Sequence, residues 1–155
     1  MRVYDIVIIG RGISALSAGI YAGMSKTKTV LIRSQSEKHM ASGVNRYVGN
    51  MEGGYEEFYR KTEKQMERFS VEKMDAEVLG IRVEKKKVVV VTDSGEVESR
   101  SVIISTRKAL DMLPEDKKKE PFVFLCGTAF NNDTEVASLA GTGAMAAIDA
   151  RLHLT

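Results

Sequence analysis

The residues best suited to chemistry in this sequence form a glycine-rich turn near its start. Gly10, Gly12 and Ala15 follow a Gly-x-Gly-x-x-Ala pattern, after an apolar run and before a helical pattern. The first glycine permits a sharp turn, and the second lets the backbone approach a pyrophosphate without a Cβ in the way. The amides of Ile13, Ser14 and Ala15 would then face the phosphate at the positive end of the helix dipole. The pattern predicts a dinucleotide site; the alternative is a turn that serves tight packing only.

The position that should bind the adenosine ribose departs from this pattern. Dinucleotide-binding turns are followed about 20 residues later by an acidic residue that accepts hydrogen bonds from the ribose hydroxyls. Here that position holds Arg33, followed by Ser34. An arginine cannot accept these bonds, although it can pair with the 2′-phosphate of NADP. The alternative is an exposed arginine with no ligand role.

The other reactive side chains give weaker signals. Cys126 is the only cysteine, which excludes an internal disulfide or a CxxC redox pair, and we favour a small buried hydrophobe over a redox thiol. Neither His39 nor His153 has Cys, Asp or Glu at metal-ligand spacing, so we predict no metal site. No local motif indicates a Ser-His-Asp arrangement, and we assign no catalytic residue.

The glycine turn lies inside a predicted β-α-β unit. Residues 3–9 form an apolar, β-rich run typical of a strand buried on both faces of a parallel sheet. Apolar residues then recur at helical spacing from Ile13, and residues 29–32 predict a second strand. A polar segment at 34–50 follows, which we interpret as a loop.

The rest of the chain predicts one further helix, several strands and a closing helix. An amphipathic helix is predicted over 55–69, with a solvated charged face. Short strands are predicted at 77–83, 87–92, 96–99, 102–105 and 122–126, with a hairpin turn at 93–95. The closing helix is predicted to begin near Asn132, which has capping-box spacing to Glu135, and its small residues should let it lie close to the sheet.

Composition excludes several classes of protein. The 155 residues include 23 Lys+Arg and 21 Asp+Glu, and 43% of them are hydrophobic. These values predict one globular domain over 1–155 and argue against disorder and against a nucleic-acid partner. No run is long and apolar enough for a membrane span, and no signal peptide is evident, so we expect a cytoplasmic protein without a membrane partner.

Two segments resemble a known family. The N-terminal stretch 5–22 resembles the start of thioredoxin reductase and related FAD-dependent pyridine nucleotide-disulfide oxidoreductases, and 140–150 resembles their final FAD-side helix. The resemblance implies a three-layer α/β, Rossmann-like FAD/NAD(P)-binding domain with a small antiparallel β insertion, from about 77 to 99. In that family an NAD(P)H domain interrupts the FAD domain. Here the corresponding junction is the charged connector 114–121, bracketed by the only two prolines, so the chain is similar to a minimal FAD domain.

The resemblance also implies ligand positions, several of which are altered. The ribose-binding acid is Arg33, and the glycine of an Ala-Thr-Gly motif is Arg107. A Gly-Asp motif becomes Gly127–Thr128, so that a hydroxyl replaces the carboxylate facing the ribityl chain. A glutamine near the flavin ring becomes Glu135, beside Val136.

Three functions follow as hypotheses. The first is a flavoprotein-like oxidoreductase relative that binds FAD on Gly10, Gly12 and the amides of 13–15. It cannot run thioredoxin reductase chemistry alone, and it needs an external donor such as a separate reductase or electron-transfer protein. The second is a non-catalytic descendant that serves as a binding or dimerisation module; whether the chain is an enzyme is left open. The third is an NADP-type binder that uses Arg33 and Ser34. We expect a homodimer, with contacts from Tyr55, Phe58 and Tyr59.

Overall fold

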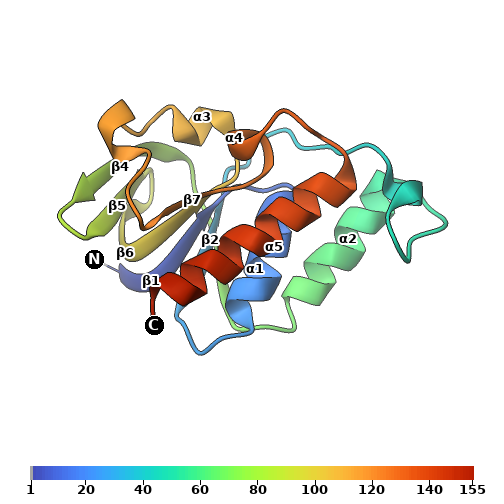
Figure 1. Ribbon diagram of the computed structural model, residues 1–155, viewed down its shortest axis with the longest axis horizontal. Coiled ribbons are helices and arrows are strands. Elements are labelled where there is room, and N and C mark those ends of the chain that lie inside the picture. The colour runs from blue at the N-terminus through green and yellow to red at the C-terminus, as the bar shows by residue number, and fades with distance from the viewer. Residues whose placement is uncertain (1) are drawn as a thin grey trace.

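A single sheet organises the molecule, whose computed structural model describes residues 2–155 (Figure 1). The sheet has seven strands in the order β3-β2-β1-β6-β5-β4, with β7 paired to β6. The strands are β1 (Arg2–Ile9), β2 (Thr29–Arg33), β3 (Val71–Asp75), β4 (Val78–Glu84), β5 (Lys87–Thr92), β6 (Gly95–Ile104) and β7 (Val123–Leu125). The helices are α1 (Ile13–Gly23), α2 (Tyr55–Met66), α3 (Arg107–Leu110), α4 (Gly127–Phe130) and α5 (Val136–His153), with 3₁₀ turns η1 (Val44–Arg46) and η2 (Glu115–Lys117).

The parallel part of the sheet places the predicted glycine turn. β1 lies between β2 and β6 and runs parallel to both, with Ile9 in register with Ile32 and Ile104. The carboxyl ends of these three strands therefore meet at one edge, where ligands bind in open α/β sheets. The predicted strand, glycine turn, helix and strand of the β-α-β unit are confirmed.

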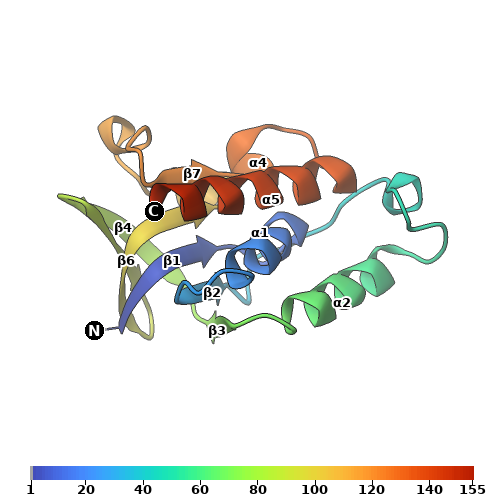
Figure 2. The same ribbon diagram turned by 60° about the horizontal axis from the view of Figure 1, so that its bottom comes forward.

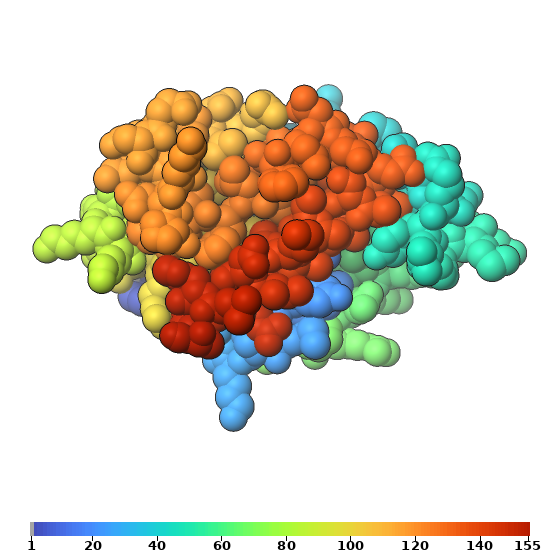
Figure 3. All heavy atoms as spheres, in the orientation of Figure 1, coloured from blue at the N-terminus to red at the C-terminus, as the bar shows by residue number. Residues whose placement is uncertain are grey.

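Side chains alternate between the two faces of the sheet along β1 and contribute to a hydrophobic core on each face. Ile6 and Ile8 face a core shared with α1, α2 and α5, and these helices form a layer on one side of the sheet (Figure 2). Val7 and Ile9 face the opposite core, which also contains side chains of β4, β5 and α3. Each fully buried aliphatic side chain stabilises the fold by about 1.5–3 kcal/mol. The predicted three-layer α/β class is confirmed, with α5 lying across the surface of the helical side (Figure 3).

Two strands differ from the prediction. β6 is one continuous strand over Gly95–Ile104, where two short strands were expected. It changes neighbours along its length, because its first half pairs antiparallel with β5 and its end pairs parallel with β7. β3 (Val71–Asp75) was not expected at all; it is an edge strand with mostly exposed or half-buried side chains, so it carries little apolar pattern.

The ends of two helices also differ from the prediction. α2 ends at Met66 rather than at residue 69. The predicted capping box is absent: Glu135 itself precedes the first turn of α5, and its side chain makes no capping bond. Asn131 and Asp133 instead accept bonds from the amides of Asp133 and Glu135, which forms two polar turns before the helix.

The small residues of α5 serve a close contact with α1, and α5 also packs on β6 and β7. A Cβ at Gly143 would lie 2.2 Å from the backbone oxygen of Ser14. Next to it, the hydroxyl of Ser17 donates to the backbone oxygen of Ala140 over 2.7 Å. Only a residue without a side chain fits at position 143, and the start of α1 is thereby held against α5.

Candidate dinucleotide site

Gly10 is required where β1 turns into α1. Its φ of +148° is rarely adopted by residues with a side chain, and a Cβ there would lie 1.7 Å from the Ser105 hydroxyl oxygen. That hydroxyl donates to the backbone oxygen of Ile9 over 2.7 Å, and so ties the end of β1 to the residue that follows β6. Packing alone therefore explains the first glycine of the pattern.

The start of α1 retains unpaired amides. The first helical bond of α1 runs from the Leu16 amide to the Gly12 oxygen over 3.1 Å. Within residues 2–155, the amides of Ile13, Ser14 and Ala15 have no hydrogen-bond acceptor, although all three residues are buried. Buried amides without partners are rare in folded proteins, and at a helix N-terminus they fit an anion such as a diphosphate.

A carboxylate lies one step before these amides. The Arg11 amide donates to Oε2 of Glu37 over 3.0 Å. Burial raises the pKa of Glu37 above its ordinary value, and the neighbouring amides of Arg11 and Gly12 only partly oppose this effect. Sequence reasoning missed this residue, because it stands in the irregular loop four positions after β2, where no periodic signal marks it.

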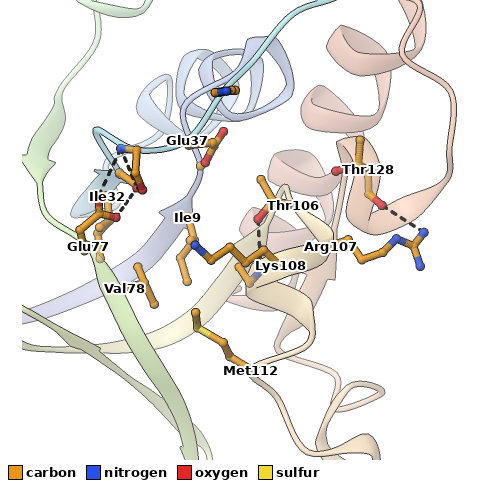
Figure 4. A pocket seen from close by; sticks show the side chains of 15 residues that line it. Ile9, Ile32, Glu37, Glu77, Val78, Thr106, Arg107, Lys108, Met112 and Thr128 are labelled. Atoms are coloured by element: carbon orange, nitrogen blue, oxygen red, sulfur yellow. Dashed lines mark hydrogen bonds between the residues drawn. The ribbon is translucent and has the colours of Figure 1, made fainter.

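A cavity of about 370 Å³ opens at the carboxyl ends of the parallel strands. Its size suits part of a nucleotide, since small-molecule pockets span roughly 300–1,000 Å³. In Figure 4, Ile32, Glu77 and Val78 lie on one side of Ile9, and side chains from residues 106–108 and Thr128 lie on the other. It is lined by Ile9, Gly10, Ile32, Ser34, Ser36, Glu37, Lys38, Glu77, Val78, Thr106, Arg107, Lys108, Ala109, Met112 and Thr128.

This cavity unites some of the predicted site residues with unpredicted ones. Of the predicted site residues, Gly10, Ser34 and Thr128 line it, whereas Gly12, Ile13, Ser14, Ala15, Arg33, Gly127, Glu135 and Val136 do not. Glu37 and Glu77 also line it, and neither was predicted to do so. Glu77 directly precedes β4, and only the pairing of distant strands brings it to this edge.

Arg33 points elsewhere. Its guanidinium forms ion pairs of 3.0 Å with Glu63 of α2 and with Asp75 at the end of β3. Its side chain is 16% exposed, and it does not line the cavity. A 2′-phosphate at this arginine would meet two carboxylates that already neutralise it.

Gly127 and Thr128 begin α4 beside the start of α1. Gly127 has a φ of +55°, and a Cβ there would lie 2.4 Å from the Ser14 hydroxyl oxygen. The glycine therefore lets α4 approach the unpaired amides closely. The Arg107 guanidinium donates to the Thr128 backbone oxygen over 3.4 Å and to Asn132 over 3.0 Å, which draws it to the α4 side of the cavity (Figure 4).

The loop 34–54 covers the start of α5. Ser42 forms a parallel bridge with Glu135, and the amide of Val136 donates to the Ser42 oxygen over 2.8 Å. Arg46 holds both carboxylate oxygens of Glu135 at 3.0 Å and lowers the pKa of that carboxyl. The two residues expected near the flavin ring are thus already bonded to the loop.

The predicted diphosphate and flavin positions differ in what surrounds them. The amides of 13–15 are unpaired within the described part of the chain but lie outside the lining of the cavity, whereas Glu135 and Val136 are bonded to the loop at Arg46 and Ser42.

The remaining candidates are structural. Cys126 is fully buried, and burial raises the pKa of its thiol to about 12. His39 stacks on Tyr59 with ring centres 4.3 Å apart, and its Nδ1 lies 2.6 Å from the Tyr55 hydroxyl. The Tyr59 hydroxyl donates to the Arg11 oxygen over 2.6 Å, so this buried tyrosine packs inside the protein rather than on a dimer surface. The homodimer stays a prediction.

The residues that the structure describes form neither a metal-binding cluster nor a membrane-spanning helix. Within residues 2–155, no three His, Cys, Asp or Glu side chains are grouped so that they could hold a metal ion. Across the same residues, no helix has the length and apolar character needed to cross a membrane.

Sequence comparison finds relatives of one kind. No protein-family model matches the chain. It is 27% identical over 151 residues to a thioredoxin reductase of Peptoclostridium acidaminophilum, covering 90% of this chain and 48% of that protein. It is 28% identical to a thioredoxin reductase of Aquifex aeolicus, covering 88% and 46%. The chain spans about half the length of these relatives.

Solved structures agree with the sequence comparison. The thioredoxin reductase of Streptococcus pyogenes matches with a TM-score of 0.61 and 26% identity, over 67% of this chain and 35% of that one. A ferredoxin-flavin thioredoxin reductase of Clostridium acetobutylicum matches with a TM-score of 0.61 and 26% identity, over 68% and 38%. In sequence and in fold, the chain is similar to part of the thioredoxin reductases.

Proposed function

We propose that the chain binds FAD, with the diphosphate on the amides of 13–15 and the adenosine in the cavity beside Gly10. The observation that carries this proposal is the set of unpaired, buried amides at the start of α1. They lie at the edge of the parallel strands, where α/β folds place dinucleotides. The relationship to thioredoxin reductases supports FAD as the cofactor.

The electron route is the second part of the proposal. Bound FAD would supply electron transfer to and from a substrate. The chain has one cysteine, and we propose that it is a single FAD-type domain in which the connector 114–121 replaces an NAD(P)H domain. Electrons would then come from a partner protein or a diffusing reductant, and the chain would not itself reduce thioredoxin.

One observation favours a second candidate. The bonds from Ser42 and Arg46 to the start of α5 close the region where the flavin ring is expected. A chain that kept these bonds would accommodate an ADP moiety but not the flavin, and would serve as a non-catalytic nucleotide-binding module. The NADP alternative has less support, because Arg33 is paired with two carboxylates outside the cavity.

Titration separates these candidates. The purified protein is mixed with FAD or ADP, and binding is measured by calorimetry and by co-elution of the flavin absorption on gel filtration. Binding of both ligands supports the flavoprotein, binding of ADP alone supports the nucleotide module, and binding of neither refutes both.

A single substitution tests whether the glycine turn binds the phosphates. Gly12→Ala puts a Cβ 3.3 Å from that of His39 and in the path of the diphosphate, so nucleotide affinity should fall at least tenfold. The matched control is Gly141→Ala, where the added Cβ meets nothing within 4 Å. Unchanged affinity in a folded Gly12→Ala protein would show that the turn is not the phosphate site.

A further inference from the structure

The cavity beside the glycine turn needs an acceptor for ribose hydroxyls that β2 does not provide. Dinucleotide folds place a carboxylate at the end of the second strand for this purpose. In this chain that residue is Arg33, and its guanidinium is drawn away from the cavity by Glu63 and Asp75. A ribose in the cavity must therefore find its acceptor on another element.

Glu37 is placed to be that acceptor. Its Oε2 accepts the Arg11 amide over 3.0 Å, in the turn between the two glycines. The amide of Gly12 also faces this carboxylate, and Glu37 lines the cavity together with Gly10 and Ser34. Figure 4 shows Glu37 above Ile9, at the end of β1, where the glycine turn begins. The carboxylate is thus held by the backbone of the turn, and a carboxylate has enough lone pairs to accept a ribose hydroxyl as well.

Glu77, the other carboxylate of the cavity, is already occupied. The Ser34 hydroxyl donates to its Oε2, and the Ser36 amide donates to its Oε1 over 3.2 Å. These bonds connect the start of the loop to the residue before β4. Glu77 therefore braces the loop that carries Glu37, and its oxygens are less open to a ligand.

We propose that Glu37 replaces the missing acid of β2 as the ribose-binding carboxylate. The inference rests on the proposed function, and it adds a preference between nucleotides that differ at the 2′ position of the ribose. A carboxylate that accepts hydrogen bonds from a 2′,3′-diol repels a phosphate in place of the 2′-hydroxyl. The site therefore selects nucleotides of the ADP type, such as FAD, and rejects 2′-phosphorylated nucleotides such as NADP.

Ligand analogues test this on the unmodified protein. Calorimetric titration compares ADP, 2′-deoxy-ADP and adenosine 2′,5′-bisphosphate. Loss of a hydrogen bond to a charged group typically costs about tenfold in affinity or more, so 2′-deoxy-ADP should bind at least tenfold more weakly than ADP. Adenosine 2′,5′-bisphosphate is compared with AMP, since both lack the second phosphate of ADP, and it should bind more weakly than AMP because a phosphate replaces its 2′-hydroxyl.

Variants test the residue itself. Glu37→Gln should reduce the affinity for ADP about tenfold and narrow the gap between ADP and 2′-deoxy-ADP. The exposed Glu52, changed to Gln, is the matched control and should leave both affinities unchanged. If the unmodified protein binds ADP but Glu37→Gln binds it equally well, or if the bisphosphate binds as tightly as AMP, the inference is wrong while the proposed function stands. If the unmodified protein binds neither ADP nor FAD, the proposed function fails first.

Discussion

The contact between α1 and α5 makes a sharp prediction for Gly143→Ala. The new Cβ would lie 2.2 Å from the Ser14 backbone oxygen, 3.0 Å from its carbonyl carbon and 3.2 Å from the Ala18 amide nitrogen. These are backbone atoms of a helix, so no side chain can rotate away. To restore van der Waals contact, the two helices must separate by about 1 Å.

The expected cost follows from two opposing effects. Overpacking in a well-packed core costs about 1–3 kcal/mol, and rigid backbone on the other side favours the upper end. Replacing glycine by alanine within a helix returns about 0.5–1 kcal/mol. The net loss in the free energy of unfolding is therefore about 2 kcal/mol, which corresponds to a Tm lower by roughly 4–8 °C for a chain of this size.

Position 141 offers the control in the same helix. Gly141→Ala makes the same chemical change two residues away, where the Cβ meets nothing within 4 Å. It should leave stability unchanged or raise it by about 0.5–1 kcal/mol. Both variants are compared with the parent by urea and thermal unfolding. If Gly143→Ala proves as stable as Gly141→Ala, α1 and α5 do not contact each other at Gly143. The position of the amides at the start of α1, which depends on that contact, would then be wrong.

Three further predictions concern titration and charge. The Cys126 thiol, with its pKa near 12, should resist a thiol-reactive dye at pH 8 in the folded protein and react once urea unfolds the chain; rapid labelling without urea would contradict its burial. Because folding raises the Glu37 pKa above its ordinary 4.5, the stability linked to its protonation is present below pH 4.5 and lost as the pH rises through the folded pKa. The free energy of unfolding of Glu37→Gln should thus exceed that of the parent at pH 7, and the difference between the two proteins should be smaller at pH 4. A difference that is the same at both pH values would contradict the raised pKa of Glu37. Arg33→Met removes two ion pairs and should cost about 1 kcal/mol in urea unfolding at low salt and less at high salt; no loss at low salt would mean that Glu63 and Asp75 do not hold the arginine.

Local patterns predicted the parts of the fold that depend on neighbouring residues. The strand at 3–9, the glycine turn, the helix from Ile13 and the strand at 29–32 each have a periodicity or a conformational demand that a short window contains. The same windows predicted β5 and the hairpin turn before β6. They did not predict β3, because a half-exposed edge strand has no apolar repeat.

In the candidate site, too, some features follow from neighbouring residues and others depend on contacts between distant residues. The sequence by itself determined that a sharp turn with free amides follows the first strand, since glycine spacing and helix geometry impose this locally. Tertiary structure alone decided that Arg33 faces Glu63 and Asp75, that Ser42 bonds to the start of α5, and that the carboxylate of Glu37 reaches the turn. The partners in these contacts are separated along the chain by between 26 and 94 residues. Which of them meet depends on strand order and on the path of a loop without a repeat, and neither property is carried by the residues in a local window.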